Sequence, residues 1–153
     1  MSQLRGRIET VAIGVADAMK YLHDKNIVVR DLKPENVGFD KEANVRLFDF
    51  GMARDVDDCE PGELYGTLRY MAPEVLRGEA CGLYSDVYSF RLLLWELLSL
   101  QVAYHGLQQP LNVLKFVQQV AHRRHVRPPL DSKRIPCEST QQLIQECWDP
   151  DYL

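Results

Sequence analysis

The sequence lacks a long apolar run. Its longest, FRLLLWELLSL at residues 90–100, includes Arg91 and Glu96, whereas a membrane-spanning helix needs about 20 predominantly apolar residues. The first residues, MSQLRGRIET, contain no apolar signal core, and the four cysteines form no CxxC pair. We therefore expect no membrane span and a reducing, intracellular, cytoplasmic setting.

Strong charge of one sign is also missing. The 153 residues carry a net charge of −4, with 46% hydrophobic and 26% charged residues. This mild acidity argues against general binding to nucleic acid or to anionic membranes. A chain of this length fits one domain with a real core. The composition therefore predicts a single ordinary globular domain without a nucleic-acid partner, and nothing in it specifies an oligomeric state.

Apolar spacing predicts several helices. Ile8, Val11, Val15, Met19 and Leu22 recur at intervals of three and four residues, which indicates an amphipathic helix ending near HDKN. Residues 85–100 are apolar on nearly every face, which is typical of a helix buried at the centre of a domain.

The ends of the remaining helices come from capping signals. Ser85 can cap the buried helix at its start. Two more helices are expected near residues 111–122 and 140–148, the second opened by a Ser139 to Gln142 capping box.

Short apolar runs at residues 27–29, 37–39 and 45–48 predict strands, with DKEAN as a hairpin turn. Residues 49–74 form a long acidic loop, and long loops in compact domains are usually functional. The predicted fold class is therefore mainly α with short β hairpins (α+β), built as a helical bundle around a buried central helix.

Three polar residues lie between two of these strands. Asp31, Lys33 and Asn36 occur in the stretch IVVRDLKPENVGFD, followed by DFG at residues 49–51 and APE at residues 72–74. Each fragment alone is weak evidence, because three-residue matches arise by chance. Their joint order is a strong signal. The bland alternative is a capped, solvated turn whose acids and amide only satisfy backbone groups.

With these motifs in this order, the chain resembles the protein kinases, and specifically the C-terminal lobe of their catalytic domain. The resemblance runs from the first helix through SDVYSF to ECWDPDYL. It implies a partial kinase domain over residues 1–153, with a catalytic loop at 29–36, an activation segment at 49–74 and a buried helix at 85–100. No glycine-rich loop or VAIK lysine precedes Met1. We therefore expect the N-terminal lobe to be absent and the domain to be truncated at both ends.

The resemblance implies phosphoryl transfer from ATP to a protein substrate. Asp31 would orient the acceptor hydroxyl and accept its proton, and Asn36 and Asp49 would hold the Mg²⁺ ions that bridge the ATP phosphates. Lys33 would steady the transferred group. A lysine two residues after the acid, with GTLRYMAPE downstream, resembles a serine/threonine kinase rather than a tyrosine kinase. Thr67 would contact Asp31 and Lys33.

Other residues have structural roles in the family. Asp86 would bond backbone N–H groups of the catalytic loop, and Phe50 and Gly51 complete the DFG triplet. Arg30 would meet a phosphate or an acid from the activation segment. Glu74 usually meets an arginine from a later segment, and we expect that arginine to be missing.

Phosphorylatable hydroxyls are few in the activation segment. Only Tyr65, Thr67 and Tyr70 carry one between residues 49 and 74. Our hypothesis is that the acidic run at residues 55–63 partly replaces a phosphate opposite Arg30. A solvated acidic loop is the alternative.

The chain also departs from the family pattern. Val29 stands where histidine usually precedes the Arg-Asp pair, which keeps an apolar contact but loses a hydrogen-bonding group. Gly38 replaces a large apolar residue in the floor of the adenine pocket, so ATP would have less surface to pack against. Arg91 lies within the buried helix, where it needs an acid or a route to solvent.

The remaining alternatives concern other kinds of site. A zinc site of His122, His125, Cys137 and Cys147 has spacings that fit no common pattern. Arg123, Arg124 and Arg127 could dock an acidic partner, but we favour an exposed basic edge. The alternative function is a catalytically inactive kinase-like lobe that acts as a protein-binding module through its helix at residues 111–120 and the loop before it.

Overall fold

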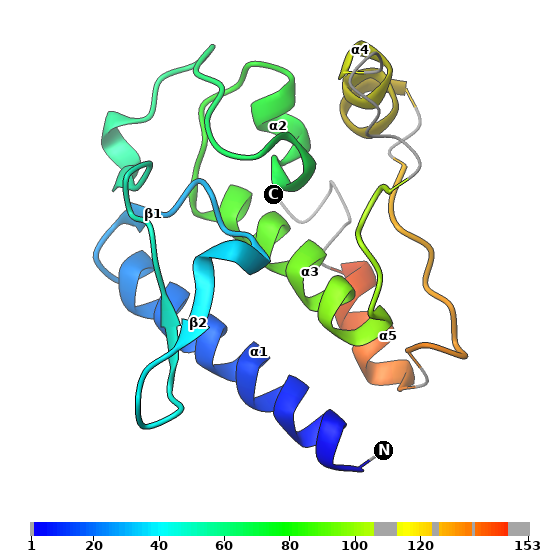
Figure 1. Ribbon diagram of the computed structural model, residues 1–153. Helices are drawn as coiled ribbons and strands as arrows, with labels where there is room; N and C mark the ends of the chain where they lie inside the picture. The colour runs from blue at the N-terminus through cyan, green and yellow to red at the C-terminus, as the bar shows by residue number, and fades with distance from the viewer. Residues whose placement is uncertain (1, 106–112, 124–125, 136, 147–153) are drawn as a thin grey trace.

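The computed structural model describes residues 2–105, 113–123, 126–135 and 137–146. Helices predominate (Figure 1), and they are α1 (Ser2–His23), α2 (Pro73–Leu76), α3 (Leu83–Ser99), α4 (Val113–Val117) and α5 (Glu138–Glu146). None of the helices within these ranges has the length and apolarity needed to cross a membrane. The predicted class, mainly helical with short antiparallel strands, is confirmed.

Two small antiparallel sheets accompany the helices. β2 (Val37–Phe39) pairs with β3 (Val45–Leu47) as the predicted hairpin. In its turn, the Oδ1 atom of Asp40 accepts the N–H groups of Glu42 and Asn44 at 3.0 and 2.8 Å. This is the side-chain to backbone bonding that favours aspartate in turns.

The second sheet corrects one prediction. β1 (Ile27–Val28) pairs with β4 (Arg54–Asp55), which lies inside the segment predicted to be a continuous loop. The prediction fails because a strand of two residues has no periodicity of its own. Its strand partner, β1, is distant in the sequence, so no local pattern reveals it.

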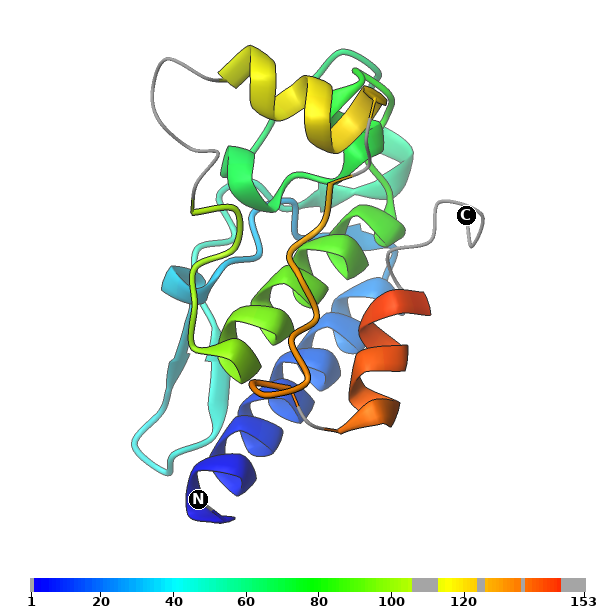
Figure 2. The ribbon, with the colours of Figure 1, turned by 90° about the vertical axis from the view of Figure 1, so that its right-hand side faces the viewer.

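Helix α3 lies at the centre of the fold, with α1 alongside it (Figures 1 and 2). One core cluster joins Val15 and Met19 of α1 to Leu93 of α3 and to Val29 and Leu32 of the catalytic loop. A second, larger cluster surrounds the other side chains of α3, including Leu92 and Trp95. The buried central helix is confirmed, and it supports the predicted catalytic loop directly.

Two helix starts differ from the prediction. Helix α3 begins at Leu83 after Gly82, so Ser85 is the third helical residue and its Oγ accepts the Gly82 N–H at 3.1 Å. Helix α5 begins at Glu138, one residue before the predicted cap Ser139. In both cases, a hydroxyl near a helix start was a correct signal for the helix but not for its first residue.

The predicted helix at 111–122 is present from Val113 onward. Helix α4 continues into a π-helical turn at Gln118–Arg123, and residues 111–112 lie outside the described ranges. The helix buries Phe116, whose ring meets Tyr104 edge-on with centroids 5.3 Å apart.

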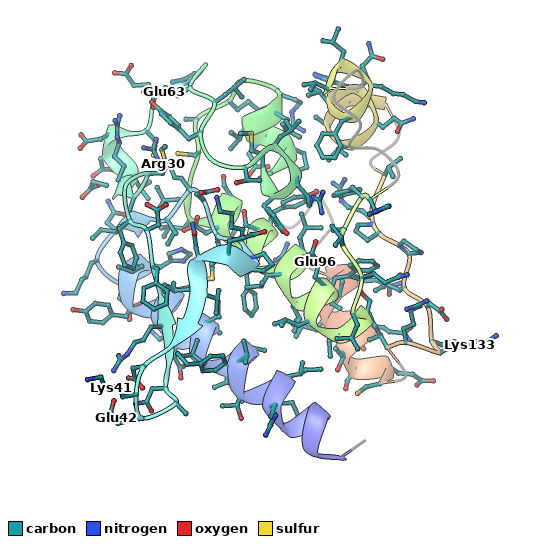
Figure 3. The ribbon with its side chains drawn as sticks, in the orientation of Figure 1. Arg30, Lys41, Glu42, Glu63, Glu96 and Lys133 are labelled. Atoms are coloured by element: carbon teal, nitrogen blue, oxygen red, sulfur yellow. The ribbon has the colours of Figure 1, made fainter. Side chains whose placement is uncertain are left out.

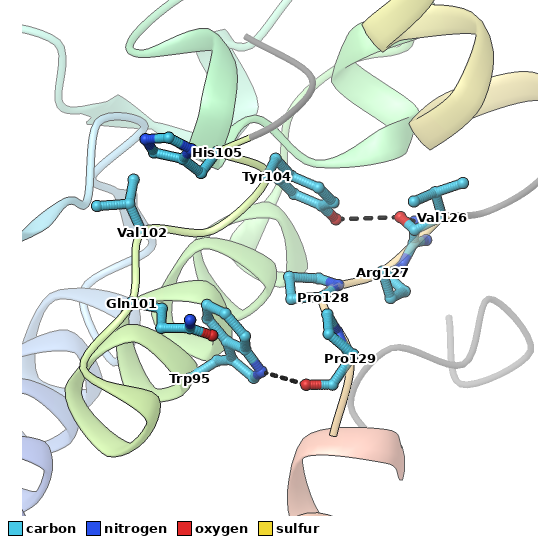
Figure 4. Close-up of a pocket in the computed structure, with 9 residues that line it drawn as sticks. All are labelled: Trp95, Gln101, Val102, Tyr104, His105, Val126, Arg127, Pro128 and Pro129. Atoms are coloured by element: carbon cyan, nitrogen blue, oxygen red, sulfur yellow. Dashed lines mark hydrogen bonds between the residues drawn. The ribbon is translucent and has the colours of Figure 1, made fainter. Parts of the chain in front are cut away.

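A hollow lies beside α3 and the loop that follows it (Figure 4). Trp95 Nε1 donates to the carbonyl of Pro129 at 3.0 Å, and Tyr104 Oη donates to the carbonyl of Val126 at 3.1 Å. These bonds hold residues 126–129 against α3 and against the loop that follows it. The hollow therefore arises where this segment packs beside α3.

Candidate active site

Residues 29–36, which we predict to be the catalytic loop and call so below, are held by Asp86 near the start of α3. Asp86 is 1% exposed and accepts the Val29 N–H at 2.7 Å and the Arg30 N–H at 2.9 Å. His23 Nε2 lies 2.9 Å from the same carboxylate. Arg30 has a φ of 67°, a backbone conformation that is unfavourable for residues with a Cβ atom. The Asp86 bonds therefore fix a backbone conformation that Arg30 would not adopt freely.

Asp31, Lys33, Asn36 and Thr67 form one hydrogen-bonded group, which we call the Asp31 cluster. Asp31 Oδ2 accepts from Lys33 Nζ at 2.6 Å, and Oδ1 accepts both the N–H and the Oγ1 of Thr67 at 2.8 Å. Asn36 Nδ2 donates to the Asp31 carbonyl at 2.9 Å, and Lys33 Nζ also donates to Thr67 Oγ1 at 2.9 Å.

The Asp31 cluster is largely shielded from water. Asp31 is 8% exposed and Asn36 is 7% exposed. Hydrogen bonds to ionised groups are stronger in such surroundings than in water. The Asp31 carboxylate is therefore held in one orientation before any ligand binds.

Gly66 allows residues 49–74, which we predict to be the activation segment and call so below, to approach the catalytic loop. Its φ is +79°, and a Cβ at this position would overlap the carbonyl oxygen of Arg30 and lie 3.1 Å from Asp31 Oδ1. Only glycine meets both conditions without strain. The contact between Thr67 and Asp31 thus depends on the residue before Thr67.

Asp49 is held much less firmly. Its side chain is exposed, its φ is 58°, and its Oδ1 accepts a long bond of 3.3 Å from the Gly51 N–H. Phe50, next in the DFG triplet, is 47% exposed. The Phe48 N–H donates to the Asn36 carbonyl at 2.8 Å, which brings the DFG triplet beside the end of the catalytic loop.

Phe48 occupies the space that a side chain at Gly38 would need. A Cβ on Gly38 would lie 2.5 Å from Cε2 of Phe48. Phe48 is nevertheless 50% exposed, so one part of its ring covers Gly38 and another part meets solvent. Gly38 therefore leaves no gap at this point, because Phe48, the residue that follows β3, supplies an aromatic ring.

A second group, the Arg30 cluster, consists of Arg30, Arg54, Glu63 and Tyr65 (Figure 3 labels Arg30 and Glu63). Arg30 Nη1 lies 3.7 Å from Glu63 Oε2, and Arg54 Nη1 lies 3.5 Å from Glu63 Oε1. The guanidinium of Arg30 stacks 3.8 Å from the centre of the Tyr65 ring. The hydrogen bond from Tyr65, helped by both arginines, lowers the pKa of Glu63. An acid of the predicted run thus faces Arg30.

Each hydroxyl of the activation segment has a partner. Tyr70 is 5% exposed and its Oη donates to Glu96 at 3.0 Å. The hydrogen bond with Glu63 is the first cause of the raised pKa of Tyr65. Thr67 belongs to the Asp31 cluster. A phosphate on any of these hydroxyls would displace an existing contact.

Three residues that depart from the family pattern or lack a usual partner can also be placed. Val29 is 3% exposed and packs in the core with Leu32, which is the apolar contact predicted for it. Glu74 is half-buried, and its Oε1 accepts from Ser85 Oγ at 2.8 Å. Arg91 is half-buried on α3.

The prediction that Arg127 belongs to an exposed basic edge is wrong. This residue is half-buried, its Nη1 donates to the carbonyls of Val120 and Val126 at 3.2 and 3.0 Å, and its guanidinium lies 5.3 Å from the Tyr88 ring centre. Arg127 therefore fastens a loop rather than facing a partner. Arg124 lies outside the described residues.

The zinc alternative can be placed only in part. His122 and Cys137 are exposed, and His125 and Cys147 lie outside the described residues. Within the described ranges, no group of three or more His, Cys, Asp or Glu side chains could hold a metal ion together.

Comparison with known families decides the relationship. The model of the protein kinase domain family matches residues 4–152. The chain belongs to the protein kinase domain family. Relatives include a probable serine/threonine-protein kinase of Dictyostelium discoideum, 38% identical over 143 residues, and the Arabidopsis thaliana serine/threonine-protein kinase STY17, 36% identical over 144 residues. The mouse proto-oncogene serine/threonine-protein kinase mos is 29% identical over 153 residues.

These alignments cover 93%, 92% and 94% of this chain, in the same order. They cover only 10%, 24% and 43% of the three relatives. The chain thus spans less than half the length of each of these kinases.

Sequence reasoning missed several residues of this kinase domain. Gly66 permits the Thr67 contact, His23 shares the Asp86 carboxylate, and Phe48 covers Gly38. A glycine just before a predicted contact residue was an available signal for Gly66. The Phe48 position gave no such signal, because it depends on which strand lies beside Gly38.

Proposed function

We propose that this chain is the C-terminal catalytic lobe of a serine/threonine protein kinase, which transfers the γ-phosphoryl group of ATP to serine or threonine hydroxyls of proteins. The Asp31 cluster carries this proposal. A buried carboxylate with a lysine at 2.6 Å and a threonine hydroxyl at 2.8 Å places an acid, a cation and a hydroxyl at one point. Phosphoryl transfer depends on such positioning and on charge neutralisation.

In this mechanism Asp31 orients the acceptor hydroxyl and takes its proton. Thr67 Oγ1 already donates to Asp31 Oδ1, so this carboxylate oxygen can accept from an alcohol at hydrogen-bond distance. Lys33 lies close enough to Asp31 to place its positive charge beside the reacting groups. Backbone bonds from Asp86 keep the loop in position throughout.

Asn36 and Asp49 fit the role of Mg²⁺ ligands. Asn36 Nδ2 is turned toward Asp31, so its amide oxygen is the atom left to meet a cation. Asp49 presents an exposed carboxylate. Both supply the hard oxygen ligands that Mg²⁺ prefers. When bound, Mg²⁺ would neutralise charge on the ATP phosphates.

We also propose that Glu63 serves in place of an activating phosphate. It faces both Arg30 and Arg54. The hydroxyls of Thr67 and Tyr70 are bonded to Asp31 and Glu96, and the hydroxyl of Tyr65 is bonded to Glu63 itself. The carboxylate is part of the sequence and needs no modification, although it carries less charge than a phosphate. The activation segment would therefore be ordered without a kinase acting upstream.

Kinase assays with purified protein test the main proposal. The chain is fused to the nucleotide-binding lobe of a relative. Phosphate transfer to serine or threonine is expected, with tyrosine a poor acceptor. Asp31→Asn should lower turnover roughly a hundredfold or more, since general-base positioning contributes about 10²–10⁴. The exposed Asp17→Asn on α1 is the matched control and should keep full activity.

Asp49→Asn separates the second role from the first. Its defect should become smaller as Mg²⁺ concentration rises, whereas that of Asp31→Asn should not. The enzyme proposal would be rejected if the protein folds and binds ATP but shows no kinase activity that Asp31→Asn abolishes.

One observation supports the binding module as a second candidate. Val113 and Leu114 of α4 are 48% and 81% exposed. Exposed apolar side chains that are adjacent on a helix can serve as protein contacts. If the enzyme proposal is rejected, Leu114→Ser should reduce co-purification of a partner without changing the melting temperature.

A further inference from the structure

Two cysteines from different segments lie against each other. Cys59 is in the activation segment and Cys81 is in the turn between α2 and α3. Both are half-buried free thiols, and their Sγ atoms are 2.7 Å apart. A disulfide bond is about 2.05 Å long. The two sulfurs thus need to move by less than about 1 Å to form one.

The backbone independently joins the same two segments. The Gly62 N–H donates to the Gly78 carbonyl at 2.8 Å. Cys59 itself is held by a bond from its N–H to the Val56 carbonyl at 3.1 Å. The approach of the two thiols therefore follows from how the chain is folded here, and not only from two side-chain rotamers.

We propose that Cys59 and Cys81 form a reversible intramolecular disulfide when the protein meets hydrogen peroxide. One thiolate attacks a peroxide oxygen, which gives a sulfenic acid and releases hydroxide that becomes water. The second thiol then attacks the sulfenic sulfur and a second water leaves. Two thiols are oxidised, one peroxide is reduced to two waters, and a dithiol reverses the reaction.

The surroundings make the two thiols slow to ionise but well placed to join. Burial, together with the neighbouring Cys81 thiol, raises the pKa of Cys59 to about 12, which lowers its thiolate fraction at neutral pH. Once either sulfur is oxidised, the other lies 2.7 Å away and can attack it at a high effective concentration.

The disulfide would close a covalent ring from residue 59 to residue 81. This ring contains Glu63, Tyr65, Gly66 and Thr67, which are the residues that contact the catalytic loop. Oxidation would therefore restrict the activation segment in the conformation seen here. Transient cytosolic disulfides commonly have sensing roles of this kind. The proposal rests on the thiol geometry and does not depend on kinase activity.

Peptide mapping of the oxidised protein tests the linkage. The purified chain is treated with hydrogen peroxide, alkylated and digested with trypsin without reduction. Cys59 falls in the peptide of residues 55–69, Cys81 in 78–91, and Cys137 and Cys147 share 135–153. We expect 55–69 linked to 78–91, with a mass about 2 Da below the sum of the two peptides.

Cys137 is the internal control for oxidant exposure. It is exposed, and hydrogen bonds from Ser139 and Thr140 lower its pKa to about 7. It should therefore react before the Cys59 and Cys81 pair. If Cys137 is oxidised while peptides 55–69 and 78–91 are recovered separately, or linked only to 135–153, the proposal is overturned.

Thermal unfolding gives a second measurement. Closing this ring should raise Tm by about 5 °C or more, and dithiothreitol should reverse the rise. Cys81→Ser should abolish the oxidant-dependent shift and Cys137→Ser should keep it. An equal shift in Cys81→Ser would contradict the proposal. If Cys81→Ser does not fold, the mapping of the unmodified sequence still decides the matter.

Discussion

The catalytic loop and the DFG triplet each supply an acid to the candidate site, but they hold these acids very differently. Asp31 is 8% exposed and bonded to Lys33, Asn36 and Thr67, whereas Asp49 is exposed and accepts a single long bond from Gly51. The first acid is preorganised by the fold described here. The second presents an open carboxylate that a cation could organise.

This difference fits the separate roles that we propose for the two acids. A group that must meet a hydroxyl in one direction benefits from being fixed before the substrate arrives. A metal ligand can be ordered by the metal itself, because the ion supplies much of the binding energy. The contrast predicts that changes around the catalytic loop affect stability strongly, while changes near the DFG triplet affect it weakly.

The largest effect is expected at Asp86. Asp86→Asn keeps the shape but replaces one acceptor oxygen by a donor, which then faces an N–H group of the catalytic loop or His23. We expect a loss of about 3 kcal/mol in the free energy of unfolding in urea. Asp17→Asn, an exposed acid on α1, is the control and should change it by less than about 0.5 kcal/mol. An equally small change for Asp86→Asn would show that the loop does not need this support.

The next effect concerns Gly66. Gly66→Ala combines an unfavourable positive φ with overlap against the Arg30 carbonyl, so we expect a loss of about 2–4 kcal/mol. Gly62→Ala is a matched control, because Gly62 has a φ of +85° and nothing within 4 Å of its Cβ position. It should lose only about 1 kcal/mol. Equal losses at both positions would mean that backbone strain, and not the close approach, decides the result.

The comparison of local motifs with tertiary contacts also shows what a sequence can predict. The contacts of Thr67 with Asp31 and Lys33, and the bonds from Asp86 to the loop, could be predicted because their motifs are local in sequence and ordered along the chain. Helix α3 could be found because its apolar residues leave no polar face. The tertiary partners are a different matter. β4, the Phe48 ring over Gly38 and the contact between Cys59 and Cys81 depend on segments that meet only after folding. Local patterns carry no information about such meetings.

A smaller effect should appear beside the DFG triplet. Gly38→Leu places a side chain where the Phe48 ring lies, and the half-exposed ring can turn away only in part. We expect a loss of about 1–2 kcal/mol. In a Phe48→Ala background the same change should cost at least about 1 kcal/mol less, because the space is then free. Additive losses in urea unfolding would show that Phe48 and Gly38 are not coupled.

The smallest effect is expected at Glu74, which is half-buried and accepts a hydrogen bond from Ser85 Oγ at 2.8 Å. Its described hydrogen-bond partner is thus a neutral hydroxyl, and the guanidinium of Arg77 interacts with it only through its charge. Glu74→Gln retains an acceptor oxygen for this bond and removes a carboxylate that is costly to shield from water. We therefore expect a change within about 1 kcal/mol, neutral or stabilising, in urea unfolding. Glu74→Ala is the contrast, because it leaves Ser85 without its acceptor and should be the less stable of the two variants. A loss larger than about 1 kcal/mol for Glu74→Gln would reveal that a positive charge stabilises this acid in solution. In that case the support of the activation segment would resemble the ion-paired Arg30 cluster more than the neutral contact at Ser85.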